Sequence, residues 1–361
     1  MKIIDELFGM PQYTIPCEEK KSLLTEELWD LTLFHKENCP EYNNIIQRIY
    51  PGLDNKPEFL TDLPYFPVRL FKSVRLKSIP DNEVMRMLTS SGTTSQQVSQ
   101  IFVDRETSLM QTKALGSIVT SFIGPKRLPM IIIDTDPTIK GKSSMSARGA
   151  GLVGLSNFGR NHFYALDENM ELNLSGLIDF VEKYGSEPIL IFGFTFMVWQ
   201  NFYEELVRKN VKLNLKNAIL IHSGGWKKLQ KLAIDNPSFK LALKEQCGIG
   251  RVHNFYGMVE QVGSVYMECE CGYLHAANFS YIIIRDNRDW SPLSVGETGI
   301  IQTLSVLPRS YPGHSILTED LGTIHGIDDC PCGRKGTYFS VTGRIPQAEL
   351  RGCSDVYAEA V

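Results

Sequence analysis

The chain has 361 residues, of which 43% are hydrophobic and 22% are charged, and its formal net charge is −4. This composition is typical of a globular protein with a sizeable core, and the net charge excludes an overall basic field that would attract nucleic acid or anionic lipid. No segment approaches the roughly 20 apolar residues of a membrane-spanning helix, and the acidic residues Asp5 and Glu6 speak against a signal peptide. We therefore expect a cytoplasmic protein whose eight cysteines are metal ligands or reactive thiols rather than disulfides.

Residues 1–83 are predicted to form an N-terminal helical segment. Apolar residues recur every three to four positions in the stretches 28–34 and 42–49, and Pro40 separates these two helices. The next stretch, "TDLPYFPVRLFKS" (61–73), contains two prolines and is predicted to be an extended passage into the following domain.

Short apolar runs alternate with helical stretches between residues 84 and 262. The runs 129–134, 188–194 and 217–225 are rich in β-formers, whereas 174–185 and 196–210 have helical spacing. This alternation predicts an α/β core, with helices covering a mostly parallel sheet. Residues 263–361 are rich in strand and turn signals and form the third predicted segment.

The stretch "MLTSSGTTSQQVS" (87–99) combines a glycine with small hydroxyl side chains. Backbone N–H groups and hydroxyl groups on such a turn can converge on phosphate oxygens, although similar clusters also form ordinary turns. The spacing is not that of a Walker loop. The candidate phosphate-binding residues are Ser90, Ser91, Gly92, Thr93 and Thr94.

Three later motifs carry further candidate residues. In "VHNFYGMVEQVG" (252–263), Tyr256 and Gly257 could face a flat ring, and Glu260 could hold a magnesium ion. Asp320 in "ILTEDLGTI" could accept the hydroxyl groups of a ribose, and Arg344 in "VTGRIPQAELRG" could reach the ribose or a phosphate. Each motif taken alone also fits an ordinary strand end or turn.

Two Cys-x-Cys pairs, each followed by glycine, stand in "MECECGYLH" and "DDCPCGRKG". Thiolates on tight glycine turns can complete the tetrahedron of a structural zinc site, which leaves no position open for substrate. The predicted ligands are Cys269, Cys271, Cys330 and Cys332; the alternative is four unrelated thiols.

The order of these motifs, from about residue 86 to the end, resembles that of the adenylate-forming superfamily. The glycine pair Gly224 and Gly225 in "HSGGW" falls where that superfamily lines its adenine pocket. The resemblance implies the large-domain fold of these enzymes and the use of ATP and Mg²⁺. A carboxylate would attack the α-phosphate to give an acyl-adenylate and pyrophosphate.

Over nearly its whole length the chain resembles the acyl-protein synthetases of the LuxE type, in "FHKENCPEY", "LFKS", "SGGWKK", "CPCGRKG" and "RGCSD". This resemblance implies that a long-chain fatty acid passes from AMP to a protein cysteine, here Cys353, and then to an acyl-reductase partner. Related phenylacetate–CoA ligases imply that His275 could replace one cysteine at the zinc. Because the sequence stops at Val361, we expect the usual mobile C-terminal domain and its lysine to be absent.

Two departures from the superfamily pattern leave other functions open. No lysine follows Ser95, and Val259 stands where many members carry threonine. An acyl- or aryl-CoA ligase and an inactive scaffold subunit with an adenylation fold are the alternatives.

Overall fold

A computed structural model of the chain describes residues 2–90, 98–136, 147–225 and 234–345. Within these ranges the chain forms two units: Phe122–Phe255 is one, and residues up to Ser121 combine with those from Tyr256 onward in the other. These boundaries differ from the predicted ones, because the N-terminal helices pack with the C-terminal strands. Among the described helices, none has the length and apolar character that crossing a membrane requires.

The unit Phe122–Phe255 is built on a parallel sheet with the strand order β5-β4-β6-β7-β8. Every residue of β4 and β6 is buried, as expected for central strands covered on both faces. The predicted α/β core with parallel strands is therefore confirmed. The strands are β4 (Leu128–Ile133), β5 (Gly159–Tyr164), β6 (Leu190–Phe194), β7 (Ile219–Ser223) and β8 (Arg251–Tyr256).

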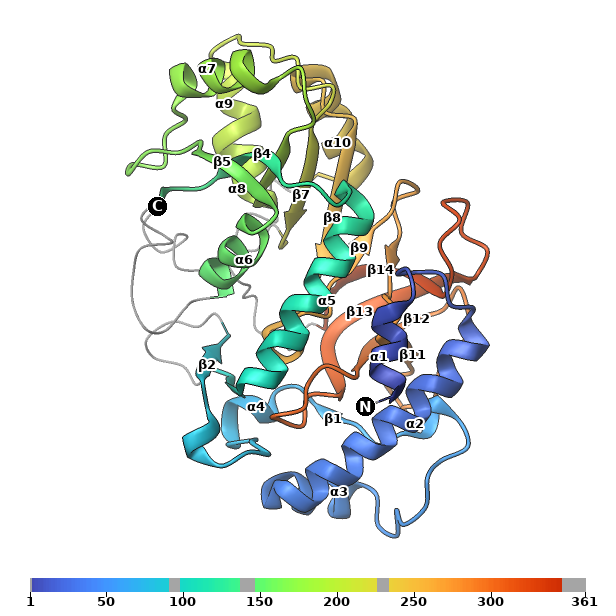
Figure 1. The fold of residues 1–361 in the computed structure, drawn as a ribbon. Helices are drawn as coiled ribbons and strands as arrows, with labels where there is room; N and C mark the ends of the chain where they lie inside the picture. The colour runs from blue at the N-terminus through green and yellow to red at the C-terminus, as the bar shows by residue number, and fades with distance from the viewer. Residues whose placement is uncertain (1, 91–97, 137–146, 226–233, 346–361) are drawn as a thin grey trace. The chain divides into compact units, whose positions relative to one another are not determined.

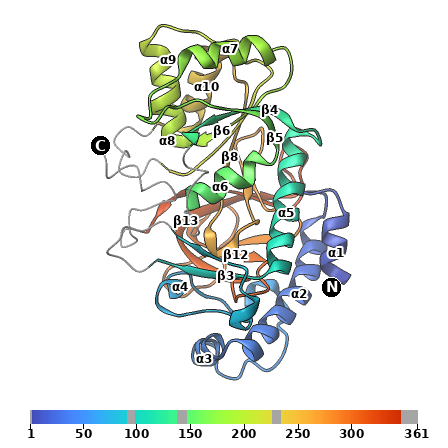
Figure 2. The same cartoon turned by 60° about the vertical axis from the view of Figure 1, so that its left-hand side comes forward.

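Helices cover this parallel sheet. Figure 2 shows α7, α9 and α10 on one side of it and α6 on the other. A π-helical turn joins α8 to α9, so the predicted helix 196–210 is in fact three short pieces in series. The helical elements are α6 (Ala147–Ser156), α7 (Leu174–Tyr184), α8 (Thr195–Met197), η4 (Val198–Tyr203), α9 (Glu204–Arg208) and α10 (Asn236–Cys247).

The other unit contains an antiparallel sheet with the strand order β11-β12-β13-β14-β10-β9, and β1 pairs in parallel with β13. A separate hairpin of β2 and β3 pairs Thr89 with Gln100 at the end from which its connecting loop leaves. The strands are β1 (Phe66–Pro67), β2 (Arg86–Thr89), β3 (Gln100–Val103), β9 (Tyr266–Glu268), β10 (Leu274–His275), β11 (Ser280–Arg285), β12 (Thr298–Ser305), β13 (Ser315–Ile327) and β14 (Thr337–Arg344).

The helices of this unit come mainly from the N-terminal part of the chain, and Figure 1 shows α1 and α2 beside β11 and β12. Pro40 occupies the first turn of α3, so the predicted break between two helices is confirmed. The passage 61–73 is not extended throughout, since it ends in the short helix α4. The helical elements are α1 (Lys2–Gly9), α2 (Cys17–Asn38), α3 (Pro40–Ile49), η1 (Leu60–Asp62), α4 (Leu70–Ser73), η2 (Asp81–Glu83), α5 (Arg105–Ile123) and η6 (Val259–Gln261).

Candidate active site and metal centre

Three of the predicted nucleotide-binding residues meet at one side chain, Asp320. The Tyr256 hydroxyl donates to Asp320 Oδ2 over 2.7 Å, and Arg344 Nε donates to Asp320 Oδ1 over 3.0 Å. Tyr256 is the last residue of β8, whereas Asp320 and Arg344 are paired directly across β13 and β14. The tertiary structure thus brings together residues that lie up to 88 positions apart in the sequence.

Asp320 lies inside a long strand and not before a turn, which corrects the turn reading of "ILTEDLGTI". The register of β13 against β14 shifts directly after Leu321, and β13 continues to Ile327. This irregularity lies next to Asp320, where a bulge can change the direction of a side chain. Burial and the neighbouring Asp320 carboxylate raise the pKa of Tyr256 well above its usual value, so the phenol stays protonated and donates.

Glu260 lies in the 3₁₀ turn η6, shortly after β8, and its side chain is buried. The next residue fixes this turn, since the Gln261 amide donates to the carbonyl oxygens of Thr303 (3.1 Å) and Gly313 (2.8 Å). Burial raises the pKa of Glu260, and the Ser99 side chain and the positive charge of Lys72 act against that rise. Burial therefore disfavours the charged form of this carboxyl group, and the two polar neighbours offset part of that effect.

Two hydrogen bonds between Ser90 and Ser99 join the two ends of the predicted phosphate loop. Ser90 N donates to Ser99 O over 3.2 Å, and Ser99 N donates to Ser90 Oγ over 2.9 Å. Ser99 is almost fully buried, and its position beside Glu260 is a contact that the sequence analysis did not predict. Four of the predicted loop residues lie outside the described part of the chain: Ser91, Gly92, Thr93 and Thr94.

The remaining predicted residues of the nucleotide site follow strand ends. Gly224 and Gly225 come directly after β7 in the parallel unit, and Gly224 has a φ of +86° that favours glycine. Gly257 directly follows β8. Cys353, the predicted acyl acceptor, lies outside the described residues.

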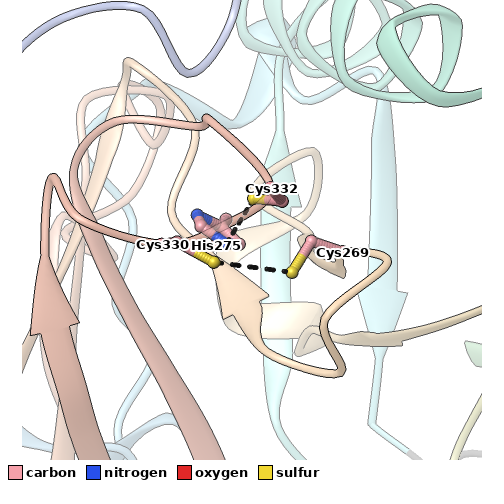
Figure 3. Close-up of side chains that lie close together, drawn as sticks. All are labelled: Cys269, His275, Cys330 and Cys332. Carbon is pink, nitrogen blue, oxygen red and sulfur yellow. Dashed lines mark hydrogen bonds between the residues drawn. The ribbon is translucent and has the colours of Figure 1, made fainter.

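A group of three cysteines and one histidine forms a candidate metal centre. The ligand atoms of Cys269, His275, Cys330 and Cys332 all lie within 4.8 Å of one another (Figure 3). Zinc–sulfur bonds of about 2.3 Å place the sulfur atoms of a tetrahedral site about 3.8 Å apart. Cys269 Sγ and Cys330 Sγ are 3.9 Å apart, and Cys332 Sγ is 3.5 Å from His275 Nε2, so the residues fit a tetrahedral metal ion.

Both cysteine turns have the same local geometry. Gly272 and Gly333 have φ values of +86° and +83°, which favour glycine. The backbone N–H of each glycine donates to the carbonyl oxygen of the first cysteine in its own turn. Cys269 and Cys330 are buried in this arrangement, and burial raises the pKa of the Cys269 thiol. A divalent cation would displace the thiol protons on binding.

The structure corrects one member of the predicted ligand set, because His275 and not Cys271 joins the cluster. Cys271 lies at the tip of the turn between β9 and β10, where its side chain is exposed. His275 lies on β10, which pairs with β9 and β14, and its side chain is fully buried. From the sequence alone, His275 is only a possible replacement for a cysteine.

Comparison with known proteins shows the family of the chain. The family model of the acyl-protein synthetase LuxE matches residues 2–361. The chain is 22% identical to the long-chain-fatty-acid–luciferin-component ligase of Aliivibrio fischeri, covering 98% of this chain and 92% of that protein. It is also 22% identical to the protein of the same name from Vibrio harveyi, covering 97% and 92% of the two chains.

Solved structures show the fold. A crystal structure of an open conformation of 2-hydroxyisobutyryl-CoA ligase, in complex with 2-HIB-AMP and CoA, superimposes with a TM-score of 0.67 at 17% identity, covering 92% of this chain and 77% of that one. The predicted fold of adenylate-forming enzymes is therefore confirmed. Because the family model spans nearly every residue, the chain belongs to the LuxE family of acyl-protein synthetases and is a ligase.

Proposed function

We propose that this ligase activates a long-chain fatty acid with ATP to form acyl-AMP and then transfers the acyl group to the thiol of Cys353. The observation that carries the proposal is the meeting of Tyr256, Asp320 and Arg344 within the family's fold. The names of the relatives from Aliivibrio fischeri and Vibrio harveyi support the choice of acid.

The Asp320 carboxylate has a geometry suited to a ribose. A carboxylate can accept several hydrogen bonds, and in this structure Tyr256 and Arg344 already orient both of its oxygen atoms. The Arg344 side chain is 41% exposed, so its guanidinium group could also contact a phosphate or the ribose of a bound nucleotide. Together these residues would hold the nucleoside end of ATP.

The remaining predicted residues would act on the phosphates. Glu260 would hold a magnesium ion, since carboxylates are the ligands that Mg²⁺ prefers, and the ion would neutralise phosphate charge. Backbone and hydroxyl donors from Ser90 to Ser95 would contact the phosphates, and Thr93 and Thr94 are our main candidates among them.

Cys269, His275, Cys330 and Cys332 would hold a structural zinc ion. Four ligand atoms would complete the tetrahedron of such an ion and would leave no position for a substrate. The ion would join the β9–β10 turn to the loop that connects β13 and β14.

The second half-reaction would use Cys353. Its thiolate sulfur would form a bond to the acyl carbonyl carbon while the bond from that carbon to the AMP oxygen breaks. AMP would leave with the electron pair of that bond, and the thiol proton would pass to solvent. The thioester could then supply an acyl-reductase partner.

Two measurements test the proposed function. The purified chain should catalyse fatty-acid-dependent exchange between ATP and pyrophosphate, and it should acquire one hydroxylamine-sensitive acyl label from a radioactive long-chain fatty acid. Cys353→Ser should retain the exchange and lose the thioester, whereas the exposed control Cys271→Ser should retain both. Absence of exchange in the wild-type chain would disprove the activation step, and a thioester that persists in Cys353→Ser would disprove the acceptor.

A further inference from the structure

The strand that carries Asp320, the proposed ribose ligand, departs from regular pairing at this residue. The pairing of β13 with β12 is regular up to Leu317 and resumes at Leu321. Between these positions one residue of β12, Ile301, faces three residues of β13. Such a bulge interrupts the ladder of hydrogen bonds, so other contacts have to fix the direction of the Asp320 side chain.

We propose that Arg69 is a positioning residue that holds Asp320 in the direction that a bound ribose requires. It acts through Glu319, the neighbour of Asp320 in the bulge. This inference rests on the proposed function, in which Asp320 contacts the ribose of ATP. It adds to the site a residue that lies 250 positions away from Glu319 in the sequence.

Two strands share the edge of β13 that lies opposite β12, and their ends meet at Glu319. β1 pairs in parallel with the start of β13, and Val68 N then donates to Leu317 O over 2.9 Å. β14 pairs in the antiparallel direction with residues 320–327, and Ile345 N then donates to Glu319 O over 3.0 Å. The two chains therefore approach Glu319 from opposite directions.

The Arg69 guanidinium group links these two strand ends. Its Nε and Nη2 atoms both donate to Glu319 Oε1, over 3.0 and 2.8 Å. The backbone oxygen of Glu319 accepts the hydrogen bond from Ile345, so the side chain and the main chain of Glu319 are held from two sides. Because Asp320 directly follows Glu319, these contacts restrict the backbone that carries the Asp320 carboxylate.

A hydrophobic cluster fixes the backbone of Arg69. Phe66 and Phe71 lie on either side of Arg69 in the sequence, and both are buried in one cluster with Ile316 of β13. The two phenyl rings are in contact, with 5.6 Å between their centroids. The guanidinium group therefore acts on Glu319 from a segment that is packed against the same strand.

The other contacts of the bulge act at different atoms. The Thr318 hydroxyl donates to a carbonyl oxygen of β12 over 2.8 Å, and it accepts from Asp320 N over 3.1 Å. Tyr256 and Arg344 donate to the Asp320 carboxylate itself. Arg69 and Thr318 thus hold the backbone of the bulge, whereas Tyr256 and Arg344 orient the carboxylate that this backbone presents.

Binding measurements with two nucleotides separate a role at the ribose from a purely structural role. In the presence of Mg²⁺ and without fatty acid, Arg69→Met should bind ATP about three- to fivefold more weakly than the wild type, as expected for a largely exposed ion pair. It should bind 2′,3′-dideoxy-ATP, which lacks both ribose hydroxyl groups, with unchanged affinity. Arg75→Met is the matched control and should change neither affinity. Arg69 and Arg75 are 57% and 56% exposed, and Arg75 pairs with Asp81 over 2.7 Å.

A second variant tests whether Arg69 acts through Glu319. Glu319→Ala should weaken ATP binding as much as Arg69→Met does, and the double variant should bind no more weakly than either, because both substitutions remove the same contact. Equal weakening of ATP and 2′,3′-dideoxy-ATP, or unchanged ATP binding in Arg69→Met, would overturn the inference while leaving the proposed function in place. A wild-type chain that bound both nucleotides equally would overturn the ribose contact of Asp320 and the inference together.

Discussion

His314 is a fully buried histidine next to the turn that carries Glu260. Its ring stacks on that of His35, with 5.0 Å between the centroids. The Thr32 hydroxyl donates to Leu28 O, so its oxygen accepts from His314 Nε2 over 2.9 Å, which assigns the proton to Nε2. Burial lowers the pKa of His314 to about 3, and the ring is therefore neutral in the folded protein at pH 7.

This burial predicts a contribution of His314 to acid sensitivity. Below the unfolded pKa of about 6.5, the unfolded chain binds a proton at His314 that the folded chain does not bind. As the pH is lowered from about 6.5 to about 3, this residue should therefore decrease the free energy of unfolding by about 1.4 kcal/mol per pH unit. Between pH 7 and pH 5, the free energy of unfolding measured with urea should decrease by about 2 kcal/mol less in His314→Gln than in the wild type.

The exposed His325 provides the control for this experiment. His325→Gln replaces an exposed histidine by the same residue and is the matched surface variant. The same decrease in His314→Gln as in the wild type would contradict the neutral buried state.

At the scale of single elements, the two Cys-x-Cys-Gly turns show what a repeated motif specifies. Each motif forms the predicted tight turn, and Gly272 and Gly333 adopt the same left-handed conformation. The second cysteine of the motif nevertheless has a different place in each turn, since Cys332 joins the cluster and Cys271 does not. The pairing of β10 with β9 and β14 brings His275 into the cluster as its fourth member.

The cluster geometry predicts an asymmetric response to substitution. Cys269→Ser and His275→Ala should lose a bound zinc ion and should lower the melting temperature, because a structural zinc site contributes directly to folding free energy. Cys271→Ser should retain both the zinc content and the melting temperature. Zinc content by atomic emission and thermal unfolding of the purified variants provide the measurements.

If Cys271→Ser lost zinc and His275→Ala retained it, the result would contradict the cluster with His275 and support the four cysteine ligands predicted from the sequence. A chelator added to the wild-type chain should lower its melting temperature toward that of Cys269→Ser.

At the scale of the whole molecule, the N-terminal helices belong to the same unit as the C-terminal strands. The buried Lys20 on α2 donates to Ala276 O over 2.9 Å, and Cys17 N donates to Asp328 Oδ2 over 2.9 Å. Before α2, Tyr13 N donates to Asn278 Oδ1 over 3.0 Å. The helices therefore satisfy polar groups of strands and loops that lie more than 250 residues away in the sequence.

This arrangement predicts that residues 1–83 are required for folding of the rest. A chain of residues 84–361 should lack a cooperative unfolding transition and near-ultraviolet circular dichroism, because its C-terminal sheet loses the partner that covers it. Adding back residues 1–83 as a separate chain should restore both signals. Cooperative unfolding of residues 84–361 alone would show instead that the N-terminal segment is an independent domain.

Particular residues show which structural features the sequence patterns predicted and which they did not. The apolar runs at 129–134, 188–194 and 217–225 predicted buried parallel strands, because a strand covered on both faces requires continuous apolar residues. Pro40 marked the helix boundary through its missing N–H group. Asp320 was named as a candidate, but its position inside a strand was not predicted, since "EDLG" has the composition of a turn.

The sequence by itself determined the local elements, the candidate residues and the family resemblance, because these depend on neighbouring residues and on motif order. Only the tertiary structure decided which of them meet. The pairing of β13 with β14 joins Asp320 to Arg344, and the strand β10 brings His275 and not Cys271 to the cysteine cluster. Such contacts arise from packing and strand register between distant segments, and short-range residue patterns do not encode them.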